Sequence, residues 1–390
     1  MTDAAASKQH IVVLGAQPEW LSGLRGPMIR DFLARGHRVT AIGAEEMPHV
    51  RTALESWGAA YVVVPIRRAG LNPLADASAM IALWRTLRRL KPDMVFAYTV
   101  KPVVYGMPVA WAAGVKQRFA MITGRGYSFQ SGPELSRRIA RIAATLLYSV
   151  GLRFANGVLF HNDDDRRMFQ QKGMLRETTR TRRIWGSGID LAHHLPEPMP
   201  TGPMRFLMVG RLIQDKGVRE FVTAAETVKA RHPEVEFRLV GPTDPSPNGV
   251  TAEEIACWKA VRAVDYIGPV LDVRPEIAAC HVLVLPSYAE GLPRSTLEAM
   301  AAGRAVITTD APGCADTVRN GETGWVVPVR DAGAIAEAME KCIADPAFVA
   351  RAGQAGLAYA HDRFDVAKVN ADIADFLGLA PSPSAISPPS

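Results

Sequence analysis

Cysteine is scarce in this chain of 390 residues, and its spacing rules out two common uses of the residue. The four cysteines, Cys257, Cys280, Cys314 and Cys342, form no C-x-x-C pair and have no histidine at ligand spacing. This pattern excludes a disulfide framework and a cysteine-based zinc site. It favours reduced core residues in a cytoplasmic protein.

Long apolar runs are also missing. Hydrophobic residues make up 48% of the chain, which is enough for two domains with cores of their own. No stretch of about 18 apolar residues occurs, as a membrane-spanning helix would need. The polar N-terminal residues and the short apolar run after them do not have the pattern of a signal peptide. We therefore expect a cytoplasmic protein without a transmembrane segment.

Several nucleotide- and nucleic-acid-binding signatures are absent. No G-x-G-x-x-G follows the first predicted strand, which disfavours a dinucleotide-dependent dehydrogenase. The spacing of a Walker P-loop does not occur either. The chain shows no recognition module and no interleaving of aromatic and basic residues, so nucleic acid is disfavoured as a partner.

Positive charge is present but unevenly distributed. The whole chain has a net charge of +6, whereas residues 1–190 carry +13 and the remaining residues carry −7. A basic first half suggests an anionic partner. Charge alone leaves nucleic acid, a membrane surface and a phosphorylated substrate as possibilities.

Strand-like and helix-like segments alternate along the chain, which predicts parallel sheets covered on both faces. The expected strands are residues 10–15, 38–43, 94–98, 119–123, 157–160, 205–210, 236–241, 264–267, 282–286 and 305–309. The predicted fold class is α/β, with two doubly wound, Rossmann-like domains that face a central cleft.

A proline-rich break at residues 193–203 predicts a linker between the two domains. The N-terminal domain is therefore expected to span residues 1–192 and the C-terminal domain residues 204–364. Residues 365–379 are expected to form a helix that packs back on the first domain. The Pro/Ser-rich residues 380–390 are expected to be disordered.

Two segments of the second domain place charged residues directly after predicted strands. Arg211 and Lys216 share the loop after residues 205–210, where their cationic groups could hold a diphosphate. Glu290 and Glu298 bracket a predicted helix start, with Pro293 at its first position. N–H groups at a helix N-terminus attract anions, and carboxylates beside a bound phosphate suit sugar hydroxyls. Each segment alone also fits an ordinary solvated loop or helix start.

Taken together, the two segments resemble glycosyltransferase family 4, whose members are retaining enzymes with the GT-B fold. The segments are Val209-Gly-Arg-Leu-Ile-Gln-Asp-Lys-Gly217 and Leu285-Pro-Ser-Tyr-Ala-Glu-Gly-Leu-Pro-Arg-Ser-Thr-Leu-Glu-Ala299, and the resemblance covers residues 210–365. The resemblance extends more weakly into the first half, where four segments look like one bacterial subgroup. These segments are residues 99–106, 122–127, 160–165 and 186–190. That subgroup adds a hexose or an N-acetylhexosamine to a polyprenyl-diphosphate-linked sugar at the cytoplasmic membrane face.

The resemblance implies roles for individual residues. Arg211 and Lys216 would bind the donor diphosphate and stabilise the charge that grows on it. Glu298 would accept hydrogen bonds from the ribose, and Glu290 would contact the donor sugar near the reacting centre. The catalytic residues implied are thus Glu290, Arg211 and Lys216. The other implied donor-binding residues are Gly15, Gly268, Val270, Gly291, Leu292, Pro293, Ser295 and Thr296. The implied acceptor-binding residues are Lys101, Thr123, Gly124, Arg125, Gly126 and His161.

The implied reaction uses a UDP-sugar or another nucleoside-diphosphate sugar as donor and a polyprenyl-diphosphate glycolipid as acceptor. Front-face attack needs no dedicated nucleophile, and no metal or cofactor is expected. The resemblance and the basic first half together predict peripheral contact with the anionic inner face of the cell membrane. Three alternatives stay open: the same fold with a soluble acceptor, a sugar-nucleotide epimerase, and a non-enzymatic nucleotide-sugar-binding module.

Three further features have competing interpretations. The acidic triplet at residues 163–165 is expected to be a helix start rather than a metal clamp. The helix predicted at 136–154 has an apolar stripe and a basic N-terminal end, so it is either an ordinary core helix or an anion- and lipid-binding one. The stripe is Ile139, Ile142, Ala143, Leu146, Leu147 and Val150, and the basic residues are Arg137, Arg138 and Arg141. His193 and His194 are expected to be solvated.

Overall fold

The computed structural model describes residues 8–66, 72–124 and 135–379. It divides the chain into two compact units, residues 1–187 with 367–390 and residues 188–366. Each unit is built around one parallel sheet. Arg125, Gly126 and the predicted disordered tail at 380–390 lie outside the described residues.

The first unit contains a seven-stranded sheet in the order β3-β2-β1-β4-β5-β6-β7, with every neighbouring pair parallel. The strands are β1 (His10–Leu14), β2 (Arg38–Gly43), β3 (Ala60–Val63), β4 (Met94–Tyr98), β5 (Gln117–Ile122), β6 (Gly157–Phe160) and β7 (Arg180–Arg183). All residues of β1, β4 and β6 are buried. Except for His10 and the hydroxyl of Tyr98, these strands are apolar, because helices cover both faces of the sheet.

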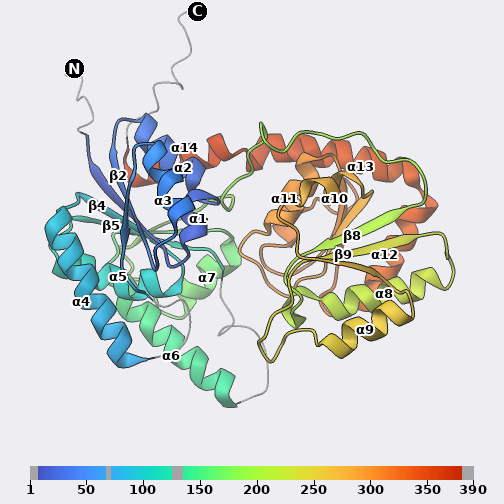
Figure 1. Cartoon of the computed structure of the whole chain (residues 1–390), viewed down its shortest axis with the longest axis horizontal. Coiled ribbons are helices and arrows are strands. Elements are labelled where there is room, and N and C mark those ends of the chain that lie inside the picture. The colour runs from blue at the N-terminus through green and yellow to red at the C-terminus, as the bar shows by residue number, and fades with distance from the viewer. Residues whose placement is uncertain (1–7, 67–71, 125–134, 380–390) are drawn as a thin grey trace, which may run out of the picture. The chain divides into compact units, whose positions relative to one another are not determined.

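Two groups of helices cover this sheet, one on each face (Figure 1). One group is α1 (Pro18–Ser22), α2 (Gly26–Ala34), α3 (Pro48–Ser56) and the C-terminal helix α14 (Val366–Leu377). The other is α4 (Pro73–Leu90), α5 (Val100–Ala112), α6 (Leu135–Leu152) and α7 (Asp163–Gln171). The helix α14 packs on the first sheet through Val369, Ile373 and Phe376.

The second unit contains a six-stranded parallel sheet in the order β10-β9-β8-β11-β12-β13. Its strands are β8 (Arg205–Val209), β9 (Glu236–Val240), β10 (Asp265–Gly268), β11 (Val282–Leu285), β12 (Ala305–Thr309) and β13 (Gly324–Val327). Its helices are α8 (Val218–Lys229), α9 (Ala252–Ala260), α10 (Arg274–Ala278), α11 (Arg294–Ala301), α12 (Ala332–Ala344) and α13 (Pro346–Tyr359). Short turns η2 (Gln214–Lys216) and η3 (Ala315–Thr317) are 3₁₀-helical, and η4 (Ala360–Phe364) is a π-helix.

The proline-rich residues 193–203 belong to the second unit, where a buried arginine holds them. Arg304 is fully buried, and its guanidinium donates to the carbonyl oxygens of Glu197 and Pro198 at 3.0 and 2.8 Å. The same side chain donates to Ile277 and Ala278. This segment is therefore packed against α10, which its composition did not indicate.

Helix α6 buries only part of the apolar stripe that its sequence suggested. Tyr148 and Leu152 face the core, whereas Ile142, Leu146 and Val150 are 55%, 61% and 55% exposed. Leu147 of the stripe packs against the core, and the side chain of Ile139 lies outside the described residues, so the stripe is partly core and partly exposed. Within the described residues, none of the helices combines the length and hydropathy that crossing a bilayer requires.

Candidate active site

The two charged segments of the second unit follow adjacent strands. β8 and β11 are paired in the centre of the sheet although β9 and β10 come between them in the sequence. The order of strands therefore reverses at this point. In doubly wound sheets, ligands bind beyond the carboxyl ends of the strands at such a switch point. The loops after Val209 and Leu285 thus lie where this fold binds ligands.

Lys216 and Glu290 form an ion pair between these two loops, with Lys216 Nζ donating to Glu290 Oε1. Their side chains are only 22% and 16% exposed. Gly217, next to Lys216, has a φ of 70°, and a Cβ atom there would collide with the backbone of Pro286. The close approach of the two loops therefore depends on glycine at this position.

Backbone hydrogen bonds hold the Glu290 loop on both sides. The N–H of Tyr288 donates to the carbonyl of Asp215 at 2.9 Å, and the N–H of Glu290 donates to the carbonyl of Pro312 at 3.0 Å. Cys314 is buried nearby, and burial together with the charge of Glu290 raises the pKa of its thiol to about 12. This thiol stays protonated at neutral pH and is a poor nucleophile.

Glu298 lies in the second turn of α11, with 10% of its side chain exposed. Arg294 Nε donates to Glu298 Oε1 at 2.7 Å, and His194 Nε2 lies 3.7 Å from the same oxygen. Burial opposes ionisation, but the interactions with His194 and Arg294 outweigh it, so the pKa of Glu298 lies below its usual value. At neutral pH Glu298 is a buried carboxylate that can accept hydrogen bonds from hydroxyl groups.

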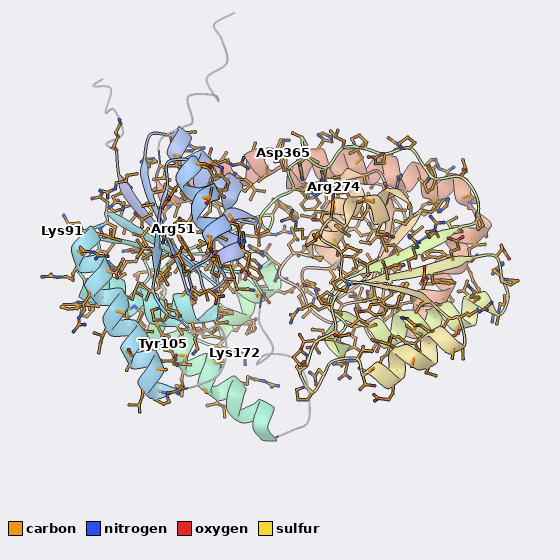
Figure 2. The ribbon with its side chains drawn as sticks, in the orientation of Figure 1. Arg51, Lys91, Tyr105, Lys172, Arg274 and Asp365 are labelled. Carbon is orange, nitrogen blue, oxygen red and sulfur yellow. The ribbon has the colours of Figure 1, made fainter. Side chains whose placement is uncertain are left out.

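A pocket of about 270 Å³ opens beside Glu298. Its lining includes His193, His194, Asp272 and Arg274, the last of which is labelled in Figure 2. Hydrogen bonds from Arg274 lower the pKa of Asp272 to about 2. Small-molecule pockets usually measure about 300–1,000 Å³. This pocket therefore suits one sugar or base rather than a whole nucleotide sugar.

His194 is buried, contrary to the expectation that both linker histidines are solvated. Its ring Nδ1 lies 3.1 Å from the carbonyl oxygen of Asp190. A carbonyl only accepts, so Nδ1 carries the proton in this contact. His193 is exposed, as expected.

Arg211 belongs to a second, more exposed ion pair. Its Nη1 lies 2.9 Å from Asp244 Oδ2, and half of its side chain is exposed. A diphosphate that bound both Arg211 and Lys216 would therefore displace Asp244 from one cation and Glu290 from the other. The structure places the two cations on one loop but pairs each with a different carboxylate.

The start of α11 differs by one residue from the prediction. Pro293 is the N-cap residue with an extended ψ of 125°, rather than the first helical residue. Thr296 Oγ1 is buried and donates to the carbonyl of Pro293 at 2.8 Å, so this hydroxyl serves the helix start. Leu292 and Ser295 are partly exposed, whereas Gly291 is buried.

Gly268 and Val270 lie on the segment that leads from β10 to the pocket. Gly268 ends the strand with a φ of 91°, and Val270 is 37% exposed. Asp272 and Arg274 follow directly on the same segment.

In the first unit, Lys101 is buried on α5 and its charge is paired. Lys101 Nζ lies 2.6 Å from Asp76 Oδ1, and Tyr105, which is labelled in Figure 2, donates to the other oxygen of Asp76 at 3.1 Å. Thr123 and Gly124 follow β5 and are both partly exposed. The contribution of these residues to acceptor binding stays a prediction.

Gly15 and His161 lie at the carboxyl ends of β1 and β6. The N–H of Gly15 donates to the carbonyl of Ile42 at 3.0 Å. His161 is buried, and desolvation, with the charge of Arg25, lowers the pKa of its imidazole well below the usual value. It is therefore a neutral imidazole at physiological pH.

Two family models match the chain, one in each half. The model described as Glycosyl transferases group 1 matches residues 203–345, and the model described as Glycosyl transferase 4-like domain matches residues 27–185. The chain is a family 4 glycosyltransferase.

Individual relatives and solved structures agree with this assignment. The glycosyltransferase is 26% identical over 334 residues to N,N'-diacetylbacillosaminyl-diphospho-undecaprenol alpha-1,3-N-acetylgalactosaminyltransferase of Campylobacter jejuni, covering 82% of this chain and 86% of the relative. It is 28% identical over 370 residues to a glycogen synthase of Mycobacterium tuberculosis, covering 91% and 83%. The structure of Anabaena HepE in complex with UDP and glucose matches with a TM-score of 0.73 at 20% identity, covering 95% and 99%. The fold of the glycosyltransferase is GT-B.

The acidic triplet of the glycosyltransferase is a helix start, as predicted. Its three aspartates form the first turn of α7, and the N–H of Asp165 donates to the side chain of Asn162 at 2.8 Å. Asp163 and Asp164 pair with arginines of the same helix. Across the part of the chain that the structure describes, no three His, Cys, Asp or Glu side chains are grouped so that they could hold a metal ion.

Sequence reasoning missed four side chains that surround the predicted donor residues of the glycosyltransferase: His194, Asp244, Asp272 and Arg274. Asp244 and Asp272 follow strands β9 and β10, so the rule that selected the other strand-end residues could have found them. No sequence signal pairs His194 with Glu298, because their contact depends on how residues 193–203 pack against α10 and α11.

Proposed function

We propose that this glycosyltransferase moves a hexose or an N-acetylhexosamine from a UDP-sugar, or another nucleoside-diphosphate sugar, to a polyprenyl-diphosphate-linked sugar in bacterial glycan assembly. The transfer retains the anomeric configuration. The main support is the arrangement of the Lys216–Glu290 pair and the buried Glu298 at the switch point of the second sheet. The relatives support the donor and acceptor classes, since the name of one includes a diphospho-undecaprenol and one structure holds UDP and glucose.

The proposed mechanism uses the cations of the first loop on the donor diphosphate. Binding of the diphosphate releases Lys216 from Glu290 and Arg211 from Asp244. As the bond to the sugar breaks, negative charge grows on the leaving phosphate, and both cations stabilise it. The leaving phosphate accepts the proton of the attacking hydroxyl, so no protein nucleophile takes part. Positive side chains supply the charge stabilisation, and the proposal includes no metal.

Glu290 and Glu298 have different tasks in this mechanism. Glu290 would face the donor sugar once Lys216 has turned to the diphosphate. Glu298 would accept hydrogen bonds from the ribose hydroxyls, and the pocket beside it would hold part of the nucleoside. Glu290 therefore acts mainly on turnover and Glu298 mainly on affinity.

A polyprenyl-linked acceptor is embedded in a membrane, so part of the enzyme must contact that membrane. One surface of the first unit has the exposed apolar side chains that such contact needs. Ile142, Leu146 and Val150 recur every fourth residue of α6 and are each more than half exposed. Residues at this spacing share one face of a helix. Large exposed apolar groups in a row mark an interaction surface, because water solvates them poorly.

Neighbouring helices of the first unit also expose aromatic and basic side chains. α5 packs against both α4 and α6. Trp84 on α4 and Trp111 on α5 are 40% and 57% exposed, and tryptophan favours the membrane–water interface. Arg85 and Arg88 on α4 are also exposed and would attract anionic headgroups. We therefore include peripheral contact with an anionic inner membrane surface in the proposed function.

A soluble acceptor is the second candidate. It is favoured by the similarity to a glycogen synthase, whose name does not include a lipid. The same donor site would serve both reactions, so only the acceptor distinguishes them. A sugar-nucleotide epimerase would also use this donor site but would need no acceptor.

A transfer assay on the full-length enzyme tests the proposal. The donors are UDP-glucose, UDP-galactose and their N-acetyl forms, each offered with a short-chain prenyl-diphosphate N-acetylhexosamine or with a free oligosaccharide. The expected result is transfer from one donor to the prenyl-linked sugar, with the donor anomeric configuration kept in the NMR spectrum of the product. Transfer only to free oligosaccharide would select the second candidate. Epimerised donor without an acceptor would contradict both.

A further inference from the structure

A cluster of buried polar side chains lies at the carboxyl edge of the first sheet, apart from the donor residues of the second unit. Tyr98 ends β4 and is fully buried, His161 follows β6 and is 5% exposed, and Arg25 precedes α2 and is 1% exposed. The guanidinium carbon of Arg25 lies 4.9 Å from the centroid of the Tyr98 ring. Arg25 Nη1 donates to Ser187 Oγ at 2.9 Å.

Arg25 is a buried cation without a matching carboxylate. None of the carboxylates in the described residues forms an ion pair with Arg25, and its Nε and Nη2 atoms have no hydrogen-bond partner there. Burial lowers the pKa of Arg25 to about 10, so the side chain is still charged at neutral pH. An unpaired buried charge is strongly unfavourable for folding, and a protein that keeps one gains if a ligand supplies the opposite charge.

Other polar side chains at the carboxyl ends of β4 and β6 share this lack of partners. Among the described residues, Tyr98 Oη, Thr99 Oγ1 and His161 Nε2 are buried and have no hydrogen-bond partner. Burial raises the pKa of Tyr98, so its hydroxyl keeps its proton and can donate. Several unpaired buried polar atoms at one sheet edge are not expected by chance, since buried polar groups are nearly always hydrogen-bonded.

The backbone at this edge is strained. Thr99 has a φ of 68° and a ψ of 161°, a conformation that a β-branched residue rarely adopts. Its side chain makes no capping hydrogen bond to α5. Strain of this kind persists where surrounding contacts enforce it, and it concentrates at binding and catalytic sites.

The loop after β1 approaches the same cluster closely. A Cβ atom on Gly15 would collide with the hydroxyl group of Tyr98. Only glycine lets the backbone run directly over the tyrosine at this strand end. The cluster therefore lies under the carboxyl ends of β1, β4 and β6, the edge at which parallel sheets bind ligands.

We propose that Arg25, Tyr98, Thr99 and His161 form a binding site for an oxyanion, a phosphate or diphosphate group of a substrate. Arg25 supplies the positive charge with two unused N–H groups in a fork geometry that matches phosphate oxygens. The hydroxyls of Tyr98 and Thr99 and the imidazole of His161 add neutral donors. Since the site is in the first unit, we assign this group to the diphosphate of the acceptor, and this last step rests on the proposed function.

The burial of these atoms has a kinetic consequence. Each unpartnered atom exposes less than 1 Å². An oxyanion reaches the cluster only when covering side chains move aside. Binding is therefore coupled to a local rearrangement, and the association rate lies below the diffusion limit.

Binding measurements on the full-length chain test the site. A Lys216→Ala background removes the main cation of the donor loop, so that anions bound elsewhere can be measured. The probes are inorganic pyrophosphate, a short-chain prenyl diphosphate and the corresponding prenyl alcohol, titrated by calorimetry. We expect both diphosphates to bind and the alcohol to bind much more weakly. Equal binding of the prenyl compounds without binding of pyrophosphate would overturn the proposal.

Two substitutions connect binding to this cluster. Arg25→Met should weaken pyrophosphate binding roughly 10- to 100-fold, and Tyr98→Phe roughly 2- to 10-fold. Tyr98→Phe should not lower the melting temperature of the ligand-free protein, because the hydroxyl that it removes has no hydrogen-bond partner. Arg25→Met removes a buried charge that has no carboxylate partner, but it also removes the hydrogen bond to Ser187. The matched control is Tyr61→Phe, whose hydroxyl donates to the carbonyl of Glu45 at 2.5 Å. This control should lower the melting temperature and leave anion binding unchanged.

The results of these experiments test the anion site and the proposed acceptor independently. Lower melting temperatures for Tyr98→Phe and Arg25→Met with unchanged pyrophosphate binding would show a purely structural cluster and overturn the proposal. Pyrophosphate binding that depends on Arg25, without transfer to any prenyl-linked sugar, would keep the site and reject the proposed acceptor. Intact binding of nucleoside diphosphate in the Arg25→Met variant without the Lys216 change confirms that the donor side is unaffected.

Discussion

Lys216 donates a hydrogen bond to the carboxylate of Glu290, and this pair joins two loops that follow adjacent strands of the second sheet. In the ligand-free enzyme each residue thus neutralises the other. A bound diphosphate carries more negative charge than one carboxylate, so it competes for Lys216. In the proposed mechanism, donor binding would therefore release Glu290 from Lys216.

Glu290→Gln should separate affinity from turnover. The amide no longer holds Lys216 by charge, so the affinity for UDP should stay equal or increase. Turnover should fall roughly 100-fold, because the carboxylate near the reacting centre is lost. Calorimetry with UDP and initial-rate kinetics measure the two effects. A large loss of UDP affinity with an unchanged kcat would contradict the assigned role.

Lys216→Ala should lose UDP affinity, in contrast to Glu290→Gln, which should keep it. It should weaken UDP binding and lower kcat/KM about 100- to 1,000-fold, since it removes a cation aimed at the leaving group. Lys172→Ala, at an exposed position after α7, is the matched control and should change neither value. Equal kinetics for the two lysine variants would exclude Lys216 from the site.

Glu298→Gln should weaken nucleotide binding roughly 10- to 100-fold while changing kcat little, because a charged acceptor of ribose hydroxyls becomes a neutral one. The exposed Glu226 on α8 supplies the matched control, Glu226→Gln, which should bind nucleotide normally. Calorimetry with UDP and with uridine checks both variants. Uridine keeps the ribose without the diphosphate, so the loss should appear with either ligand.

Glu298 also predicts a pH dependence of stability. Its pKa in the folded protein lies below the usual 4.5, because His194 and Arg294 outweigh the effect of burial. The unfolded chain therefore binds the proton first as the pH falls. The stabilising contribution of Glu298 is complete above about pH 4.5 and decreases as the pH falls through the folded pKa. The difference in melting temperature between the wild type and Glu298→Gln should shrink in the same range.

The fold class and most strands could be predicted from the sequence alone, because most of the strands are nearly continuous apolar runs. Helix α5 could not be predicted from the sequence. This helix is buried on most sides and contains Pro108, so its sequence has neither a polar face nor clean helical periodicity. The same holds for β7, whose residues Arg180–Arg183 are all basic or polar. An edge strand of this kind owes its conformation to pairing with β6 rather than to its own sequence.

Within the site, the sequence placed Lys216 and Glu290 on loops that the structure brings into contact, because both follow strands of one parallel sheet. It did not indicate that Arg211 pairs with Asp244 or that His194 is buried beside Glu298. These contacts depend on side-chain packing between distant segments. The polar cluster around Arg25 was missed for the same reason, since a lone arginine before a helix normally lies in solvent.

The exposed stripe on α6 predicts binding to anionic vesicles. Changing Ile142, Leu146 and Val150 together to serine should reduce co-sedimentation with phosphatidylglycerol vesicles at least tenfold, because about 0.8 kcal/mol is lost for each CH₂ group that no longer enters the membrane. Folding stability should hardly change, since these side chains are more than half exposed. Raising the salt concentration should weaken binding of the wild type by screening the arginines.

Val261→Ser is the matched control for the vesicle experiment. Val261 is 58% exposed but lies in the second unit, after α9. Its substitution should leave vesicle binding unchanged. If the triple variant sediments with vesicles as the wild type does, the α6 stripe is not a membrane surface, and the proposed peripheral contact loses its structural support.

The burial of His161 predicts how the folding stability of the first unit changes as the pH falls. Its pKa in the folded protein is well below the usual 6.5, chiefly through desolvation and also through the charge of Arg25. Below about pH 6.5 the unfolded chain takes up a proton that the folded chain does not. The folded state therefore loses about 1.4 kcal/mol of stability for each pH unit below this value, as long as the buried imidazole stays neutral.

His161→Gln removes this loss. Between pH 7 and 5 the melting temperature of the variant should fall less steeply than that of the wild type, even if the variant is less stable at pH 7. His49→Gln, at an exposed position on α3, is the matched control, since it changes the residue type without removing a buried imidazole. Parallel melting curves for the wild type and His161→Gln over this range would mean that His161 takes up its proton without unfolding. In that case another group of the folded unit would neutralise the charge of Arg25. Arg25 would then not be an uncompensated buried cation.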